Sequence, residues 1–324
     1  MGALTILVTG AGGFIGREVV ETALARGHGV RALVRRNCSD FGGIDGLECI
    51  AFDLADDAGA LDNALRGVDA VIHCAAAMGG DDAAMQRDTV APTRALVRAL
   101  KAAKPQPRLV LVSSIAVYAP DALPEMATID ENTPLEEFPE GRDAYTRAKL
   151  AQEAAVRGSG LSGWIARPGA VYGPGRVWNA HLGPKIGPVL LRLGREGQIP
   201  LISVAGCAEA LVRAAETPPP VRGMRAVNLV DDDLPDRERF LLALGRTAPG
   251  LIVPVGWRLF DRLAGLFTRF PGLARRMPGL LRPGPLRARM RPATYSNARA
   301  RAELKWHSAQ PFENAMRHAL RGPA

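Results

Sequence analysis

Leu4-Thr-Ile-Leu-Val-Thr-Gly-Ala-Gly-Gly-Phe-Ile-Gly16 joins an apolar run to three glycines spaced three residues apart. The run over 4–9 is typical of a buried parallel strand, and the pattern over 14–26 predicts a helix that ends at Gly27. Between a strand and a helix, such glycines permit a tight turn, close approach of the backbone to a pyrophosphate, and close packing of helix on strand. The helix N-terminus adds N–H groups for the phosphates. The stretch therefore predicts dinucleotide binding, at Gly10, Gly13, Phe14, Ile15 and Gly16.

Strands and helices alternate beyond this opening, which indicates a parallel sheet covered on both faces. We expect an α/β fold: a Rossmann-type doubly wound parallel sheet with a small C-terminal α/β substrate lobe. Residues 1–167 are predicted to form the dinucleotide-binding domain, interleaved with a substrate-binding lobe over 168–324. Residues 168–200, rich in Gly and Pro, predict a binding loop and a helix. The predicted strands are 29–34, 47–52, 69–74, 108–113, 163–167 and 225–230, and the predicted helices are 57–66, 83–103, 205–217, 236–246 and parts of 293–320.

Composition bounds the class of protein. The chain has 324 residues and a net charge of +8, but only 5% aromatic residues and no nucleic-acid-binding motif, which argues against nucleic acid as a partner. No stretch is apolar enough to span a bilayer, and the start shows no signal peptide. The four cysteines form no Cys-x-x-Cys pair and no metal-ligand set, so we expect reduced thiols, no metal and a cytoplasmic protein.

The residues at the end of the second predicted strand indicate which cofactor the protein binds. An acid there usually accepts from the ribose 2′-OH of NAD, whereas this chain has Arg35 and Arg36. Arg35 is suited to a 2′-phosphate, so we expect NADP, with NAD as the alternative if both arginines are only solvated. Asp53-Leu54 follows the third strand and suits either an adenine contact or a helix N-cap.

The segment His73-Cys-Ala-Ala76 ends the fourth predicted strand. The small residues Ala75 and Ala76 leave room for the ribose and nicotinamide of the cofactor. His73 is expected to be structural.

Tyr145 and Lys149 stand four residues apart, which places them on one helix face. A neighbouring ammonium lowers the pKa of a phenol, so the pair is suited to acid–base work near neutral pH. Ser114 ends the fifth predicted strand, where open parallel sheets bind ligands. Together the three residues predict a catalytic site, although a Tyr-x-x-x-Lys pair alone also occurs by chance in surface helices.

With these motifs the chain resembles the extended short-chain dehydrogenases/reductases, the NAD(P)-dependent epimerase/dehydratase family. The resemblance rests on Thr9-Gly-Ala-Gly-Gly-Phe-Ile-Gly16, Asp53-Leu54, His73-Cys-Ala-Ala76, Ser113-Ser114, Tyr145-x-x-x-Lys149, Arg167-Pro-Gly-Ala-Val-Tyr-Gly-Pro174 and Tyr295 to Trp306. It implies that Tyr145 is the general acid/base, that Lys149 holds the ribose and lowers the tyrosine pKa, and that Ser114 polarises the substrate oxygen. It further implies Pro168 at the cofactor, and it allows a homodimer, an arrangement common in the family.

Departures from the family pattern bear on the substrate. Thr89 stands where the family often has Asn, and Ile115 and Ala116 replace the acidic pair of nucleotide-sugar dehydratases, which disfavours dehydration. The resemblance implies a nucleotide sugar as first substrate class, gripped by residues 167–174 and Asn179, with oxidoreduction or epimerisation at a secondary alcohol or ketone. The alternative is a 3β-hydroxysteroid dehydrogenase-like enzyme for an apolar alcohol, and a second alternative is an NADP-sensing module without turnover.

Residues 251–292 contain nine arginines, one acid and many Leu, Phe and Pro. Three interpretations stand open. The segment packs its apolar stripe on the domain, or covers a large apolar substrate as a lid, or lies on an anionic membrane surface and makes the protein membrane-associated.

Overall fold

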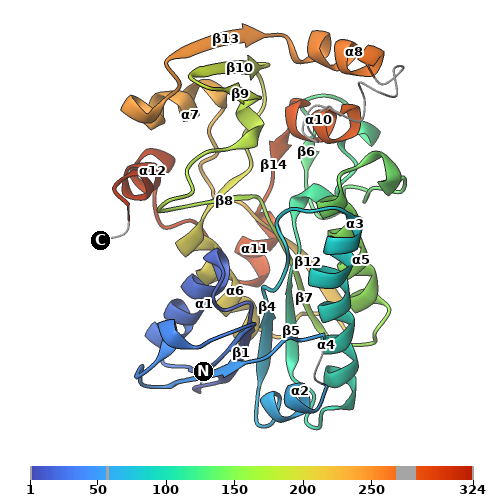
Figure 1. Ribbon diagram of the computed structural model, residues 1–324, viewed down its shortest axis with the longest axis vertical. Helices are drawn as coiled ribbons and strands as arrows, with labels where there is room; N and C mark the ends of the chain where they lie inside the picture. Colours follow the sequence, from blue (N-terminus) through green and yellow to red (C-terminus); the bar gives the residue numbers. More distant parts are fainter. Residues whose placement is uncertain (1, 56–57, 268–281, 323–324) are drawn as a thin grey trace.

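The computed structural model describes residues 2–55, 58–267 and 282–322, and its centre is a seven-stranded parallel sheet (Figure 1). Because the strand order reverses between β1 and β4, the chain leaves the carboxyl ends of these two strands toward opposite faces of the sheet, which forms a crevice at that edge. The strands lie in the order β12 (Met224–Leu229), β7 (Gly163–Pro168), β5 (Arg108–Val112), β4 (Ala70–His73), β1 (Thr5–Thr9), β2 (Gly29–Val34) and β3 (Leu47–Ala51).

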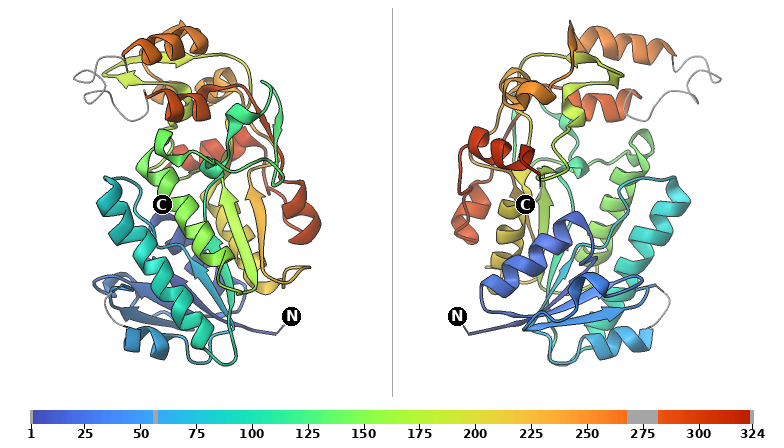
Figure 2. Two further views of the ribbon diagram at one scale, coloured as in Figure 1. Left: turned by 90° about the vertical axis from the view of Figure 1, so that its right-hand side faces the viewer. Right: turned by 60° about the vertical axis from the view of Figure 1, so that its left-hand side comes forward.

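Helices cover both faces of the sheet, as Figure 2 shows. On one face, α1 (Phe14–Ala25) and α6 (Val204–Glu216) share a core cluster with side chains of β1, β2 and β4. On the other face, α2 (Ala58–Ala64), α4 (Ala91–Ala102) and α5 (Ala144–Arg157) contribute to a second cluster. The predicted doubly wound α/β fold is confirmed.

The predicted helix over 83–103 is one helical segment with an irregular middle. It comprises α3 (Asp82–Met85), a π-helical stretch over Gln86–Val90, and α4. The wider π turn places Thr89 and Thr93 in the interior, where both are 1% exposed.

The upper lobe in Figure 1 contains a small sheet in the order β13 (Leu251–Val255), β10 (Val189–Leu193) and β9 (Lys185–Ile186). The helix predicted within 168–200 is wrong, because that segment forms β8 (Ala170–Tyr172), β9 and β10, with only a short 3-10 turn over Ala180–Leu182. Its prolines and glycines suit edge strands and tight turns better than a helix. The remaining elements are α7 (Arg237–Leu244), α8 (Trp257–Phe267), α10 (Pro283–Met290), α11 (Ala298–Glu303), α12 (Phe312–Leu320), β11 (Leu201–Ser203), β6 (Thr128–Ile129) and β14 (Thr294–Tyr295).

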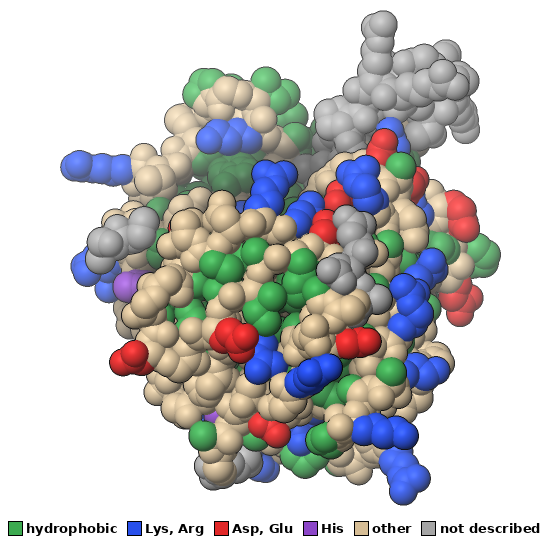
Figure 3. Space-filling view, turned by 60° about the horizontal axis from the view of Figure 1, so that its bottom comes forward, with side chains coloured by type: hydrophobic (Ala, Val, Ile, Leu, Met, Phe, Trp, Pro, Cys, Tyr) green, Lys and Arg blue, Asp and Glu red, His purple; other side chains and the backbone are tan. Residues whose placement is uncertain are grey.

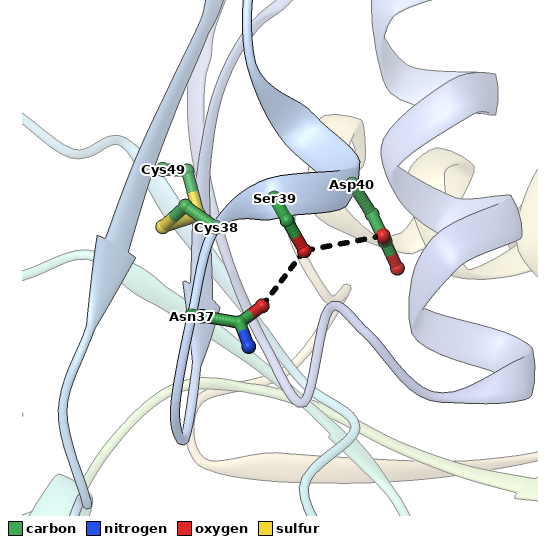
Figure 4. The surroundings of a disulfide bond; sticks show 5 residues. All are labelled: Asn37, Cys38, Ser39, Asp40 and Cys49. Carbon is green, nitrogen blue, oxygen red and sulfur yellow. Dashed lines mark hydrogen bonds between the residues drawn. A yellow bond between two sulfur atoms is a disulfide. The ribbon is translucent and has the colours of Figure 1, made fainter.

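Cys38 and Cys49 form a disulfide (Figure 4), so the expectation of four reduced cysteines is wrong for this pair. The cause is the register of the sheet. β2 pairs in parallel with β3, which brings the turn after β2 against Cys49 on β3, with the two Cα atoms 5.8 Å apart. Spacing along the chain does not reveal this proximity. Cys74 and Cys207 are free thiols.

The arginine-rich segment 251–292 is described over 251–267 and 282–292. Arg258, Arg289 and Arg291 form ion pairs with Glu125, Asp143 and Asp121, which lie in the first half of the chain. These pairs favour packing of the segment on the domain. On the face in Figure 3, basic side chains are interspersed with acidic ones rather than gathered in one band. Among the described residues, no helix combines the length and apolar character needed to cross a bilayer.

Candidate active site

A cavity of about 690 Å³ opens at the carboxyl ends of the central strands. The glycine turn after β1, the end of β5 and the start of α5 line it from the sheet, while β8 and α10 line it from the upper lobe. The cavity therefore lies at the reversal of strand order, where doubly wound folds bind their ligands.

The glycine turn fits a dinucleotide pyrophosphate. Gly10 has φ +67°, and a Cβ there would lie 2.8 Å from the backbone of Ala75. A Cβ on Gly16 would lie 2.2 Å from the Gly10 carbonyl oxygen, so helix and strand need this glycine to pack. No side chain caps α1 at Gly13, which leaves the first N–H groups of the helix for an anionic ligand.

The three predicted catalytic residues meet at the cavity. Ser114 follows β5, while Tyr145 and Lys149 lie in the first two turns of α5. Asp143 begins that helix by accepting a hydrogen bond from the Thr146 amide at 2.8 Å, which fixes where Tyr145 emerges. The Ser114 hydroxyl lies near enough to the Tyr145 phenol to lower its pKa, and the Lys149 Nζ lies 5.8 Å from the centre of the Tyr145 ring.

The pKa of Tyr145 is raised, so the expected lowering is wrong in this structure. Burial is the main cause, and the Ser114 hydroxyl offsets only part of it. Lys149 is itself buried, which lowers its pKa to about 8. Its ammonium is directed to the Val112 carbonyl oxygen and to Gln152, at 2.8 and 2.9 Å. A raised pKa keeps the Tyr145 phenol protonated near neutral pH, ready to donate a proton.

Arg167 does not reach the cavity, contrary to the expected contact with a sugar nucleotide. Its guanidinium binds both carboxylate oxygens of Glu153, at 2.8 and 2.6 Å, and both side chains are at most 2% exposed. Ser113 donates to Glu153 at 2.6 Å, and Tyr118 joins Arg167 to Asn228. This buried network supports the strand ends beneath the site, and Pro168 is the first residue of its segment that lines the cavity.

The predicted cofactor residues fall into two groups. Gly10, Gly13, Phe14, Ile15, Gly16, Ala76 and Pro168 line the cavity, whereas Arg35, Asp53, Leu54 and Ala75 are not part of its lining. Arg35 lies at the end of β2 with its Nε 3.5 Å from Asp53 and its Nη1 3.4 Å from Asp88. Asp53 also accepts from the Ala55 amide at 3.0 Å, whereas helix α2 begins at Ala58.

We expect Arg35→Ala to reduce the preference for NADPH over NADH by about tenfold or more, because a charge-assisted hydrogen bond contributes about 1.5–3 kcal/mol. The Arg35 side chain is 53% exposed and can turn from the two carboxylates toward a 2′-phosphate. The measurement is the ratio of the two Kd values by fluorescence titration. Arg36→Ala, at the exposed neighbour, is the control, and an unchanged ratio in Arg35→Ala would remove the NADP assignment.

Sequence reasoning missed several residues that line the cavity. The missed apolar members include Met78, Met85, Ile129, Trp178 and Ala288, and a missed polar member is Arg289, which is paired with Asp143 at 3.0 Å. These residues come from loops and from α3, β6 and α10, so no local motif marks them. Two residues that the sequence did single out also line the cavity: Ile115, and Asn179, which accepts from the His181 amide and ring at 2.9 and 2.7 Å.

Comparisons with known proteins agree with this geometry. The family model described as NAD dependent epimerase/dehydratase family matches residues 6–229. A ceramide reductase of Caulobacter vibrioides is 30% identical over 66% of this chain, and the chain spans 61% of that relative's length. A 3-diazoavenalumate denitrifying reductase of a Streptomyces species is 31% identical over 80% of this chain and 90% of the relative.

A solved structure, MoeE5 in complex with UDP-glucose and NAD, superposes with a TM-score of 0.70 at 21% identity, over 99% of this chain and 98% of that one. This likeness shows a common fold. Together with the glycine turn, the strand order and the matched model, it leads to one conclusion: the chain belongs to the NAD dependent epimerase/dehydratase family, the extended short-chain dehydrogenases/reductases.

Proposed function

We propose that this enzyme reduces a ketone to a secondary alcohol, and catalyses the reverse oxidation, with Ser114, Tyr145 and Lys149 as its catalytic residues. The observation that carries the proposal is the convergence of Ser114, Tyr145 and Lys149 on the same cavity as the uncapped start of α1. The nicotinamide cofactor supplies the hydride when it is bound.

Each of the three catalytic residues has a separate role in the reaction. Ser114 donates a hydrogen bond to the substrate oxygen and orients it. Tyr145 transfers its phenolic proton to the same oxygen as the alcohol forms, and the raised pKa of this phenol keeps the proton available at neutral pH. The Lys149 ammonium has three donors, of which two are taken by Val112 and Gln152, so the third is left for the ribose of the cofactor.

The cavity favours a substrate with an apolar body. Its lining includes the apolar side chains of Met78, Met85, Ile115, Ile129 and Trp178. Two of its arginines, Arg142 and Arg289, are already neutralised by Glu136 and Asp143. A relative named for ceramide, a lipid, and a relative named for an aromatic acid derivative support the same choice.

A nucleotide sugar is the second candidate. Arg176 favours it, because this exposed side chain lines the cavity and lies over the Phe14 ring at 4.8 Å, beside the phosphate-binding turn. No ion pair of Arg176 with an acid is found among the described residues. Asn179 also lines the cavity, at the position where the sequence predicts a grip on the sugar nucleotide.

The test is NADPH oxidation with a panel of long-chain keto lipids, steroid ketones, aromatic ketones and keto-sugar nucleotides. We expect turnover with one of the apolar classes in the wild type, and a rate at least about 10²-fold lower in Tyr145→Phe. Turnover confined to keto-sugar nucleotides would show that the second candidate, a nucleotide sugar, is the substrate class. Equal rates in wild type and Tyr145→Phe for every compound would refute the catalytic assignment.

A further inference from the structure

The Lys149 ammonium is held by one neutral side chain. Lys149 is 3% exposed and Gln152 is fully buried, one helical turn further along α5. The Lys149 Nζ lies 2.9 Å from the Gln152 Oε1. Because an ammonium only donates hydrogen bonds, Gln152 must present its carbonyl oxygen to Lys149 and its NH₂ group to the opposite side.

The opposite side of Gln152 is fixed by Thr93 of α4. The Gln152 Nε2 lies 2.6 Å from the Thr93 Oγ1, and that hydroxyl donates its hydrogen to the Thr89 carbonyl oxygen at 2.8 Å. With its only hydrogen used, the Thr93 oxygen can only accept, so it receives a hydrogen from Gln152. This assignment of donors and acceptors excludes the flipped Gln152 amide, which would place its NH₂ group against the Lys149 ammonium.

The chain of hydrogen bonds continues to the cofactor turn. The His73 Nε2 lies 2.9 Å from the same Thr93 oxygen, so it must carry the hydrogen, and the Nδ1 accepts from the Thr9 hydroxyl at 2.7 Å. Burial lowers the pKa of His73 to about 3, which keeps the ring neutral. Thr9 directly precedes Gly10. The network thus connects Lys149 to the end of β1, where the glycine turn begins.

We propose that Gln152 is the positioning residue of Lys149, and that Thr93 and His73 lock its amide in the one orientation that accepts from the ammonium. The inference rests on the catalytic role proposed for Lys149. It gives a function to Gln152, which no motif in the sequence marks. It also gives a second reason for the burial of His73.

Four other titratable groups face Lys149. Cys74 and His73 end β4, Tyr145 lies one turn before Lys149 on α5, and Glu153 lies one turn after it. Glu153 is engaged by Arg167 and Ser113. Gln152 is a neutral acceptor, so it orients the Lys149 ammonium without placing a second carboxylate beside it. Such a carboxylate would hold the ammonium proton more tightly and would compete with the cavity for the third N–H of Lys149.

The chain has only five lysines, so NMR of ¹³C-labelled lysine can follow Lys149 directly, with its signal assigned by Lys149→Met. We expect Gln152→Glu to raise the measured pKa of Lys149 by about 1–3 pH units, because it places an opposite charge within hydrogen-bonding distance. Gln152→Leu should lower that pKa, since the buried ammonium loses an acceptor. Gln106→Glu is the matched control, because among the described residues the Gln106 side chain bonds the Leu100 carbonyl oxygen and has no contact with Lys149.

A second pair of variants tests the lock without altering Gln152. Thr93→Val removes the oxygen that holds the amide and is expected to lower the pKa of Lys149, while Thr93→Ser keeps the oxygen and the wild-type value. Lys149 pKa values that are unchanged in Gln152→Glu, or equal in the two Thr93 variants, would overturn the inference. The proposed function fails by a different result, which is wild-type turnover in Lys149→Met.

Discussion

Tyr145→Phe is expected to lower kcat by about 10²–10⁴-fold while the Kd of the cofactor stays nearly unchanged. The substitution removes one hydroxyl and keeps the half-buried ring, so the packing of α5 is preserved. The lost rate is the contribution of a proton donor placed beside Ser114 at the substrate oxygen. Steady-state kinetics with the substrate found in the screen, together with a cofactor titration, measure the two quantities.

Tyr295 provides a matched hydroxyl for this test, because it is also a half-buried tyrosine that lines the same cavity. Tyr295→Phe should change kcat far less than Tyr145→Phe. A Tyr145→Phe enzyme that keeps the wild-type kcat would mean that the proton comes from another group. A large loss of cofactor affinity would instead mean that the phenol acts in binding.

Arg167→Met is expected to reduce the free energy of unfolding by about 3–5 kcal/mol. The variant leaves the Glu153 carboxylate buried without its bidentate partner, since both side chains are at most 2% exposed in the wild type. Ser113 and the partly exposed Arg157 then remain to stabilise the charge. Urea unfolding followed by circular dichroism measures the loss.

Arg157 offers the control, because it also pairs with Glu153, at 3.3 Å, but its side chain is 40% exposed. Arg157→Met should cost no more than about 0.5 kcal/mol, as other exposed pairs of this spacing do. The double variant Arg167→Met with Glu153→Met should recover much of the stability, because no buried charge remains. Equal losses in the two arginine variants would show that burial of the Arg167 pair is not what matters.

The same pair predicts a dependence on pH. Burial raises the pKa of Glu153, but the Arg167 guanidinium more than offsets it, so the net shift is downward. A carboxyl group with a lowered pKa stabilises the fold above its unfolded pKa, about 4.3, and loses that contribution as the pH falls toward the folded value. The wild type should therefore lose more stability than Arg167→Met as the pH falls below about 4.

The sequence by itself determined the fold and the positions of the chemistry. Residues 4–16 carry a strand, a glycine turn and a helix start as one continuous pattern, and Tyr145 and Lys149 stand one helical turn apart. Such features depend on spacing along the chain and on backbone conformation, both of which are local. The alternation of apolar strands with helices then leaves few ways to cover a parallel sheet.

Only the tertiary structure decided which side chains meet. Arg167 belongs to a motif but turns to Glu153 rather than to the cavity, and Cys38 meets Cys49 because β2 lies beside β3. Gln152, an ordinary helix residue in the sequence, lies between Lys149 and Thr93. The pKa of Tyr145 also rises where a nearby lysine predicts a fall, because the burial of the phenol is the largest influence on it. Burial and hydrogen-bond partners arise from segments far apart in the chain, and no local pattern records them.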